Sequence, residues 1–279
     1  MFKVNNRIAT LFLISLVALS LILVGCSSTT TPAPTSVEKA TIKVGATAVP
    51  HAEILEFIKP ILAEKGIDME IIVFNDYVQP NLATDKGEID ANYFQHEPYL
   101  ETFCADHDLD LVSIAKVHLE PMGIYSKKFT STDDFEQGET IAIPNDPSNA
   151  GRALAILQTA GLIELKEGVG IEGTIQDISS NPKEFDIKMI EAAQLPRVLT
   201  DPKVAGAVIN TNFALEADLN PTEDALYLED KESPYANIFV VRADRKDDPI
   251  LKEVAATLNS DEVRTFIEET YKGAVIPAF

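Results

Sequence analysis

From Thr41 onward, short β-rich apolar runs alternate with longer amphipathic runs, and this alternation limits the fold more than any other feature. Strand and helix in regular succession predict an α/β fold with parallel strands. The predicted strands cover residues 41–45, 69–74, 89–92, 111–119, 122–125, 141–143, 174–178, 206–210 and 238–242. The predicted helices cover residues 52–65, 78–86, 97–104, 195–200, 249–259 and 261–271, with a further helix beginning after Asp146.

The chain from Thr41 to the C-terminus is longer than one typical domain and contains no low-complexity insert. The long extended run 111–119 meets Pro121, where we expect the chain to leave a first lobe, and the run 238–242 brings it back. A doubly wound lobe interrupted by a second one places a ligand between them, at the carboxyl ends of strands. We predict that residues 41–120 and 238–279 form lobe 1 and that residues 121–237 form lobe 2.

Residues 1–25 have the pattern of a secretory signal, with Lys3 and Arg7 ahead of an apolar stretch. The stretch ends in Leu23-Val24-Gly25-Cys26, which resembles the lipobox of bacterial lipoproteins, whose cysteine is lipidated and becomes the mature N-terminus. A transmembrane anchor is the alternative, but the stretch is shorter than the roughly 20 residues that span a bilayer. Residues 26–40 are predicted to be a lipidated N-terminus and flexible linker, because Ser, Thr and Pro dominate them.

The chain is strongly acidic. Removing Lys3 and Arg7 from its 23 basic residues leaves 21 against 44 acidic ones, a net charge of −23. Nucleic acid and anionic lipid are therefore poor partners. With Cys26 lipidated, Cys104 has no second cysteine, so the fold must be held by its core.

Two motifs suggest chemistry that their surroundings do not support. Residues 168–173 match the dinucleotide fingerprint G-x-G-x-x-G, but they follow a charged helix end rather than a strand, so we interpret them as a turn. His96-Glu97 begins like the zinc motif H-E-x-x-H, but Leu100 stands where the second histidine belongs. No nucleophile elbow or Cys/His pair appears either, so the sequence predicts no enzyme and no cofactor.

A metal site is a further alternative. Asp106-His107-Asp108 could bind a metal together with His51, His96 and His118. These histidines lie at separate strand and helix ends, whereas metal ligands come as a spaced set with supporting partners. We therefore expect Asp106–Asp108 to be a solvated helix end and predict no metal.

The junction at residues 143–152 predicts an anion site. Asp146 and Pro147 have the pattern of an N-cap and the first helical residue, so Asn149 and Arg152 share one face of the first two turns. Because Asp146 occupies the helix N-terminus, an incoming carboxylate would be bound bidentately by Arg152. The alternative is an arginine paired with some surface acid.

Aromatic and amide side chains gather at other predicted strand ends. Tyr77 follows the second strand, and Tyr93, Phe94 and His96 follow the third; aromatic faces suit an apolar ligand with a soft, sulfur-containing tail. Asparagine side chains both donate and accept, as an ammonium and a carboxylate on one carbon require. They are Asn149, Asn210, Asn212 and Asn237.

Four segments resemble the NlpA family of substrate-binding lipoproteins, the methionine-binding components of ABC importers. The segments are residues 44–53 (VGATAVPHAE), 92–100 (NYFQHEPYL), 142–152 (AIPNDPSNAGR) and 210–214 (NTNFA). The resemblance covers residues 41–279 together with the signal and the lipobox.

The resemblance implies a two-lobed periplasmic-binding-protein fold (type II-like) that closes on methionine and delivers it to a membrane permease driven by a cytoplasmic ATPase. It implies that Arg152, helped by Asn149, holds the ligand carboxylate, and that Asn210 and Asn237 hold the amino group. Tyr77, Phe94 and His96 would line the thioether pocket. The protein would be anchored in the cell membrane by the lipid on Cys26, facing the extracytoplasmic side. The family also leaves open D-methionine, a methionine-containing dipeptide or another small solute, and a metal-binding lipoprotein and a surface enzyme stay open as other classes.

Overall fold

The computed structural model describes residues 40–230 and 234–279 of the 279-residue chain. The predicted signal peptide, the lipidated Cys26 and the linker up to Lys39 lie outside these residues. Within the described part, no helix combines the length and the hydrophobicity that crossing a membrane requires.

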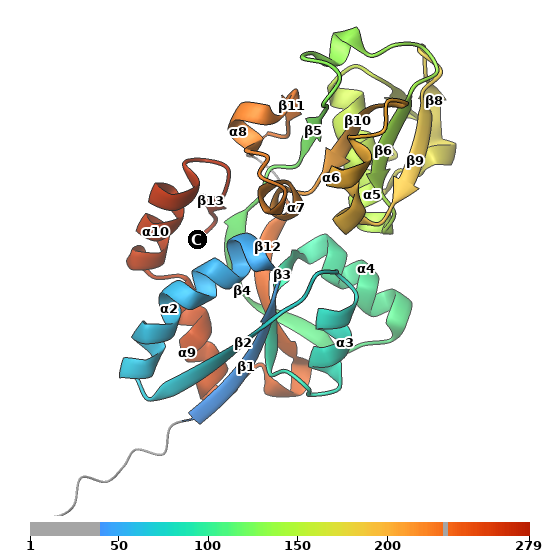
Figure 1. The fold of residues 1–279 in the computed structure, drawn as a ribbon. Helices are drawn as coiled ribbons and strands as arrows, with labels where there is room; N and C mark the ends of the chain where they lie inside the picture. Colours follow the sequence, from blue (N-terminus) through green and yellow to red (C-terminus); the bar gives the residue numbers. More distant parts are fainter. Residues whose placement is uncertain (1–39, 231–233) are drawn as a thin grey trace, which may run out of the picture. The chain divides into compact units, whose positions relative to one another are not determined.

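The structure contains two principal sheets (Figure 1). The larger has six strands in the order β13-β4-β12-β3-β1-β2. Strands β1, β2 and β3 run parallel, whereas β12 pairs antiparallel with both β3 and β4. The strands are β1 Ala40–Ala46, β2 Ile67–Val73, β3 Ala91–His96, β4 Leu111–Leu119, β12 Ala236–Arg242 and β13 Ile276–Pro277.

Helices cover both faces of this sheet, and the side chains of β12 show why. Phe239 and Val241 pack into a core with α2, α9 and α10, while their neighbours Ile238 and Val240 pack with Leu100 of α4 on the other side. Successive strand residues point to opposite faces, so a strand that is apolar throughout must be buried on both. The helices are α2 Glu53–Glu64, which follows the helical turn η1 Ala48–Ala52, and α3 Gln79–Asp85, α4 Glu97–His107, α9 Pro249–Leu258 and α10 Asp261–Tyr271.

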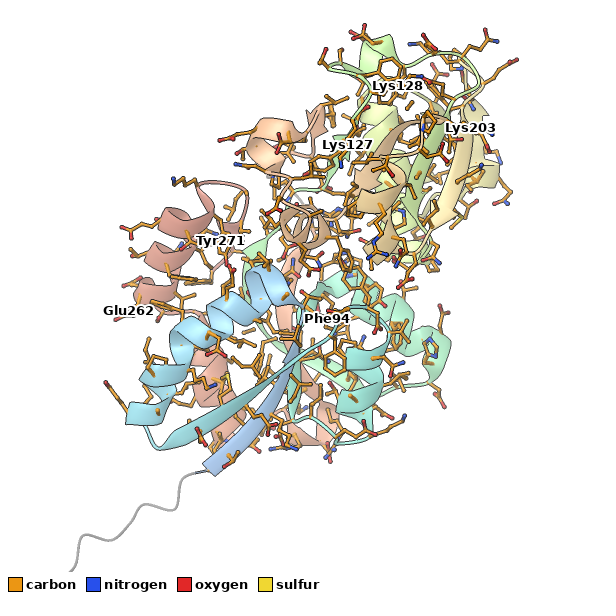
Figure 2. The ribbon with its side chains drawn as sticks, viewed as in Figure 1. Phe94, Lys127, Lys128, Lys203, Glu262 and Tyr271 are labelled. Atoms are coloured by element: carbon orange, nitrogen blue, oxygen red, sulfur yellow. The ribbon has the colours of Figure 1, made fainter. Side chains whose placement is uncertain are left out.

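The last helix is tied to the first part of the chain. Tyr271, labelled on α10 in Figure 2, donates a hydrogen bond from its hydroxyl to Oε2 of Glu53 at 2.6 Å. Ile267 of α10 and Ile54 of α2 are fully buried in the same core. The C-terminal helix α10 therefore packs against α2, the helix that follows the first strand.

The second sheet has five strands in the order β11-β5-β10-β6-β9. Ile141 and Ile143 of β6 face α5, and Ala142 between them faces α6 and α7. The strands are β5 Gly123–Tyr125, β6 Thr140–Pro144, β9 Asp186–Ile190, β10 Val204–Ile209 and β11 Tyr227–Leu228. The helices are α5 Pro147–Thr159, α6 Leu195–Val198, α7 Thr211–Glu216 and α8 Pro221–Asp224, and β7 Glu164–Leu165 pairs with β8 Ile178–Ser180 in a separate two-stranded sheet.

The structure corrects several predicted elements. Both principal sheets are mixed rather than parallel, because strands returning from one sheet to the other run antiparallel to their neighbours. Residues 174–178 form a helical turn, η4 Ile175–Asp177, since the Thr174 and Asp177 side chains satisfy the backbone there instead of a strand partner. Strand β9 was not predicted; its charged side chains are exposed at the sheet edge, so it lacks an apolar run.

Two segments join the sheets. The chain passes from β4 to β5 through Glu120 and Pro121, and it returns from β11 to β12 after Glu229. Both glutamates contact the same arginine of α5, so the connections and the first turns of α5 lie together.

Candidate ligand-binding site

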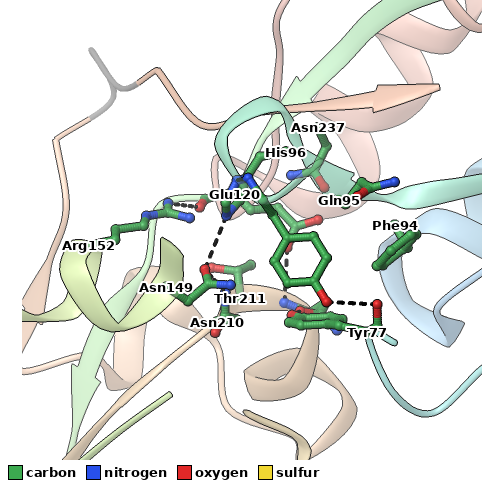
Figure 3. A pocket seen from close by; sticks show the side chains of 12 residues that line it. Tyr77, Phe94, Gln95, His96, Glu120, Asn149, Arg152, Asn210, Thr211 and Asn237 are labelled. Carbon is green, nitrogen blue, oxygen red and sulfur yellow. Dashed lines mark hydrogen bonds between the residues drawn. The ribbon is translucent and has the colours of Figure 1, made fainter. Parts of the chain in front are cut away.

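All seven residues predicted to bind a ligand line one pocket (Figure 3). Tyr77, Phe94, His96 and Asn237 come from strands of the six-stranded sheet or the segments that follow them. Asn149 and Arg152 come from α5, and Asn210 stands between β10 and α7. The site therefore draws on both sheets, as the sequence predicted.

The start of α5 is built as the sequence predicted. Asp146 is the N-cap and accepts a hydrogen bond from the backbone N–H of Asn149 at 2.9 Å, and Pro147 is the first helical residue. Asp146 also accepts from the Asn149 side chain, whose Nδ2 lies 3.0 and 3.1 Å from its two carboxylate oxygens. The cap therefore fixes both the helix start and the orientation of the Asn149 amide.

A chain of hydrogen bonds orients the polar groups of the pocket. His96 caps α4 by accepting from the Tyr99 backbone N–H at Nδ1, so its Nε2–H donates to Oδ1 of Asn149 at 3.1 Å. Burial, followed by the positive charge of Arg152, lowers the pKa of His96 to about 3, which keeps the ring neutral. The Asn149 Oδ1 also accepts from Nδ2 of Asn210 at 2.9 Å. Among the residues that the structure describes, the Asn210 Oδ1 is buried with no hydrogen-bond partner, and so is Nδ2 of Asn212.

Unpaired buried polar atoms are costly, about 1–3 kcal/mol each. One of these two atoms accepts and the other donates, and both belong to residues that line the pocket. A small molecule with an ammonium group and a carboxylate group would satisfy both.

Arg152 is only 3% exposed, and two of its three nitrogens already donate to the protein. Its Nε and Nη2 lie 3.1 and 2.5 Å from the two carboxylate oxygens of Glu229. Nη2 also donates to the backbone oxygen of Glu120 at 2.8 Å (Figure 3). The guanidinium stacks on the Tyr235 ring, with 4.1 Å between its central carbon and the ring centroid. The sequence predicts that the guanidinium has two donors free to bind the ligand carboxylate. In the structure Glu229 accepts from Nε and Nη2 instead, so Nη1 is the nitrogen without an internal partner in the described residues.

Aromatic rings form an apolar wall of the pocket. Tyr77 lies 5.9 Å from Phe94, 5.7 Å from Tyr99 and 5.0 Å from Phe213, measured between ring centroids. The Tyr77 hydroxyl donates to Oδ1 of Asn212 at 2.5 Å, so this ring bridges the two sheets. Phe94 and His96 lie within strand β3, which runs from Ala91 to His96, rather than after a strand ending at residue 92. Tyr93, on the opposite face of that strand, belongs to the core.

A second cluster lies beside the pocket. His51, His118 and Glu120 are all buried, and each offers one atom that could bind a metal ion. These atoms lie within 4.8 Å of one another. The expectation that the histidines lie apart is therefore wrong for His51 and His118, because β1 and β4 belong to the same sheet and bring their ends together. His96, by contrast, is not part of this cluster and contacts Asn149.

Sequence reasoning left several lining residues out of the predicted site. Glu120 is the most important of them, since it is the one acidic residue among the pocket-lining side chains. A carboxylate directly between the long strand β4 and Pro121, at the predicted exit from the first lobe, was the available signal. The other residues left out are Gln95, Tyr99, Thr211 and Asn212.

The apparent dinucleotide fingerprint does not form a phosphate site. Residues 168–173 make a turn and the short helix η3 Gly170–Glu172; they follow β7 of the small antiparallel sheet rather than a strand of a parallel sheet, and no α-helix opens from them. The carbonyl oxygen of Ile171 packs directly against Gly151 of α5, where an added Cβ would lie only 2.1 Å away. The segment covers the helix that carries Asn149 and Arg152.

Residues 42–279 match the family model described as NlpA lipoprotein. This chain belongs to the NlpA lipoprotein family. It is 42% identical over 258 residues to the D-methionine-binding lipoprotein MetQ of Yersinia pestis, an alignment that covers 92% of this chain and 93% of the relative. The family membership confirms that the chain is a binding protein rather than an enzyme.

Solved structures of family relatives share the fold. A nutrient-binding protein from Burkholderia cenocepacia, bound to methionine, is 48% identical with a TM-score of 0.82, over 85% of this chain and all of that one. Lipoprotein Tp32 from Treponema pallidum is 40% identical, also with a TM-score of 0.82, over 86% of this chain and all of that one. The predicted α/β, two-lobed substrate-binding fold is confirmed by these similarities.

Proposed function

We propose that this protein captures methionine in the extracytoplasmic space and delivers it to an ABC importer. The observation that carries the proposal is the pocket itself, in which buried amide groups, a guanidinium and an aromatic wall meet between two sheets. The Yersinia pestis relative is named for D-methionine and the Burkholderia cenocepacia structure holds methionine, which supports the same ligand here. L-methionine is the ligand to test first and D-methionine the second.

The polar residues divide between the two charged groups of an amino acid. We assign the carboxylate to Arg152, through its Nη1 edge, with the unpaired Nδ2 of Asn212 as a second donor. Asn149 helps indirectly, because its side chain is used in orienting His96 and Asn210. We assign the amino group to the unpaired Oδ1 of Asn210 and to Asn237.

The thioether side chain belongs against Tyr77, Phe94 and His96. Aromatic rings bury a methionine side chain and make favourable sulfur contacts, about 0.3–1.5 kcal/mol each. His96 suits this wall because it is neutral, as its low pKa requires.

Ligand binding is expected to favour a closed arrangement of two lobes. The contacts that support this are the hydrogen bonds that join pocket residues of the two sheets, His96 to Asn149 and Tyr77 to Asn212. We propose residues 41–120 with 238–279 as lobe 1 and residues 121–237 as lobe 2. The connections at Glu120 and Glu229 would then act as the hinge.

Delivery requires a membrane partner. We propose that the lipid on Cys26 anchors the protein to the cell membrane, and that an ABC permease with its cytoplasmic ATPase accepts the ligand. The names of the relatives as lipoproteins support the anchor. Labelling cells with a palmitate analogue, with Cys26→Ala as the control, tests it; incorporation into the variant would overturn it.

Native mass spectrometry of freshly purified protein tests the ligand. A bound mass equal to methionine, lost on dialysis and restored by adding methionine, is the expected result. A mass equal to a methionine-containing dipeptide would replace methionine by that peptide. A bound metal ion, with methionine failing to bind, would favour the His51, His118 and Glu120 cluster as the functional site and overturn the proposal.

A further inference from the structure

Glu120 is a buried carboxylate that lines the pocket and is not paired with a lysine or arginine side chain in the described residues. It is 7% exposed and lines the pocket together with Arg152 and Asn237. Its side-chain oxygens accept from Nε2 of His118 at 2.7 Å and from the backbone N–H of Asn212 at 3.1 Å. Nε2 of His51 lies 3.3 Å from the carboxylate but is hydrogen-bonded to Oδ1 of Asn237 at 3.0 Å. The negative charge of Glu120 would be neutralised by these histidines only if one of them were protonated.

Both histidines are neutral. Burial lowers the pKa of His51 to about 4 and that of His118 to about 3. The hydroxyls of Thr47 and Tyr93 lie at the two Nδ1 atoms, where each donates to the ring and leaves Nε2 carrying the hydrogen. His118 directs this hydrogen to Glu120, and His51 directs it to Oδ1 of Asn237. His118 therefore orients the carboxylate, and neither histidine neutralises its charge.

Arg152 does not neutralise the charge of Glu120 either. Among the residues lining the pocket Arg152 is the one fixed cation, and its Nε and Nη2 are paired with Glu229, whose side chain is 14% exposed. The guanidinium touches Glu120 through the backbone oxygen rather than the carboxylate. With Arg152 and Glu229 cancelling, the charge of Glu120 remains unbalanced in a site sheltered from water, and burial accordingly raises its pKa.

We propose that Glu120 accepts the ammonium group of the ligand, on the same side of the pocket as Asn210 and Asn237. The inference rests on the proposed function and names the chemistry that the site requires. A ligand must carry a free primary amine, so an α-amino acid or a peptide with a free N-terminus fits and an N-acylated amino acid does not. The ligand ammonium replaces the missing counter-charge, which no internal side chain of the pocket supplies.

Titration calorimetry with two ligands tests this assignment. The ligands are methionine and 4-(methylthio)butanoate, which keeps the thioether and the carboxylate but lacks the amino group. In Glu120→Gln, the new amide oxygen still accepts from His118 while the charge is removed. We expect methionine affinity to fall about thirtyfold, as for loss of a charge-assisted hydrogen bond, and the affinity for the butanoate to change less than about threefold.

Glu216→Gln is the matched control. Glu216 is an exposed carboxylate on α7 that does not line the pocket. Its neutralisation should leave methionine affinity within about threefold of the wild type. Thermal unfolding of both variants shows that they are folded.

Two results would overturn the assignment while leaving the proposed function intact. One is Glu120→Gln binding methionine as the wild type does. The other is an equal loss for both ligands, which would make Glu120 a residue that only shapes the pocket. Wild-type protein that binds neither ligand would overturn the proposed function itself, and this inference with it.

Discussion

Replacing Arg152 with alanine should affect stability and ligand affinity at once, and the structure allows the two effects to be separated. The substitution removes the guanidinium that pairs with Glu229, whose side chain is only 14% exposed, and that bonds to the Glu120 backbone oxygen. Removing one partner of a buried ion pair leaves the other charge uncompensated, at a cost of about 3–5 kcal/mol. For a domain of this size 3 kcal/mol corresponds to a fall in Tm of roughly 6–12 °C.

Ligand affinity should fall as well. A charge-assisted hydrogen bond between Arg152 and the methionine carboxylate is worth about 2 kcal/mol, or roughly thirtyfold in Kd. Differential scanning calorimetry measures the first effect and titration calorimetry with methionine the second.

A double variant separates the two roles of Arg152. Arg152→Met with Glu229→Gln removes the uncompensated carboxylate, so we expect most of the lost Tm to return while methionine affinity stays low. If the double variant bound methionine within a factor of a few of the wild type, Arg152 would serve the internal ion pair alone. If Arg152→Ala lowered the unfolding free energy by less than about 1 kcal/mol, the pair would not be buried as described.

Three further substitutions or conditions have defined outcomes. Asp146→Ala removes the N-cap of α5 and should cost about 1 kcal/mol of unfolding free energy by denaturant titration, with Asp146→Asn retaining most of it; equal values for all three proteins would contradict the cap. Gly151→Ala places a Cβ 2.1 Å from the Ile171 oxygen and should cost about 1–3 kcal/mol in the same assay, whereas unchanged stability would mean that the 168–173 turn does not cover α5. Because the pKa values of His51 and His118 are lowered, these histidines stay neutral in the folded protein while the unfolded chain takes up protons below about pH 6.5. Each histidine should therefore reduce the unfolding free energy by up to about 1.4 kcal/mol per pH unit as the pH falls from 6.5 toward 4. Glu120 opposes this slope, because its raised pKa lets the folded protein take up a proton before the unfolded chain does. Stability that is constant over this range would contradict neutral histidines.

Features encoded within a few residues were predictable from the sequence. The N-cap at Asp146 and the first helical residue Pro147 placed the start of α5, and helical spacing put Asn149 and Arg152 on one face. Strands with apolar runs, such as β6 and β10, were recognised because both of their faces are buried. The seven predicted residues line one pocket because strand ends of α/β sheets converge.

Features that depend on distant partners were not predictable. Glu229 is 77 residues from Arg152 in sequence, and nothing local marks it as the acid that takes the guanidinium. His51 and Glu120 meet only because sheet order places β1 and β4 in one sheet. Edge strand β9 escaped prediction because exposed charges replace an apolar face. Tertiary pairing, rather than local pattern, decides each of these.

Titration of the ligand-free mature protein with L-methionine tests the central claim most directly. The account predicts saturable binding of one methionine per chain, together with a rise in Tm that grows with the logarithm of methionine concentration above Kd, about 2.7 kcal/mol of added stability at one hundred times Kd. Absence of both heat and Tm shift at millimolar methionine, in protein shown to be folded, would contradict it.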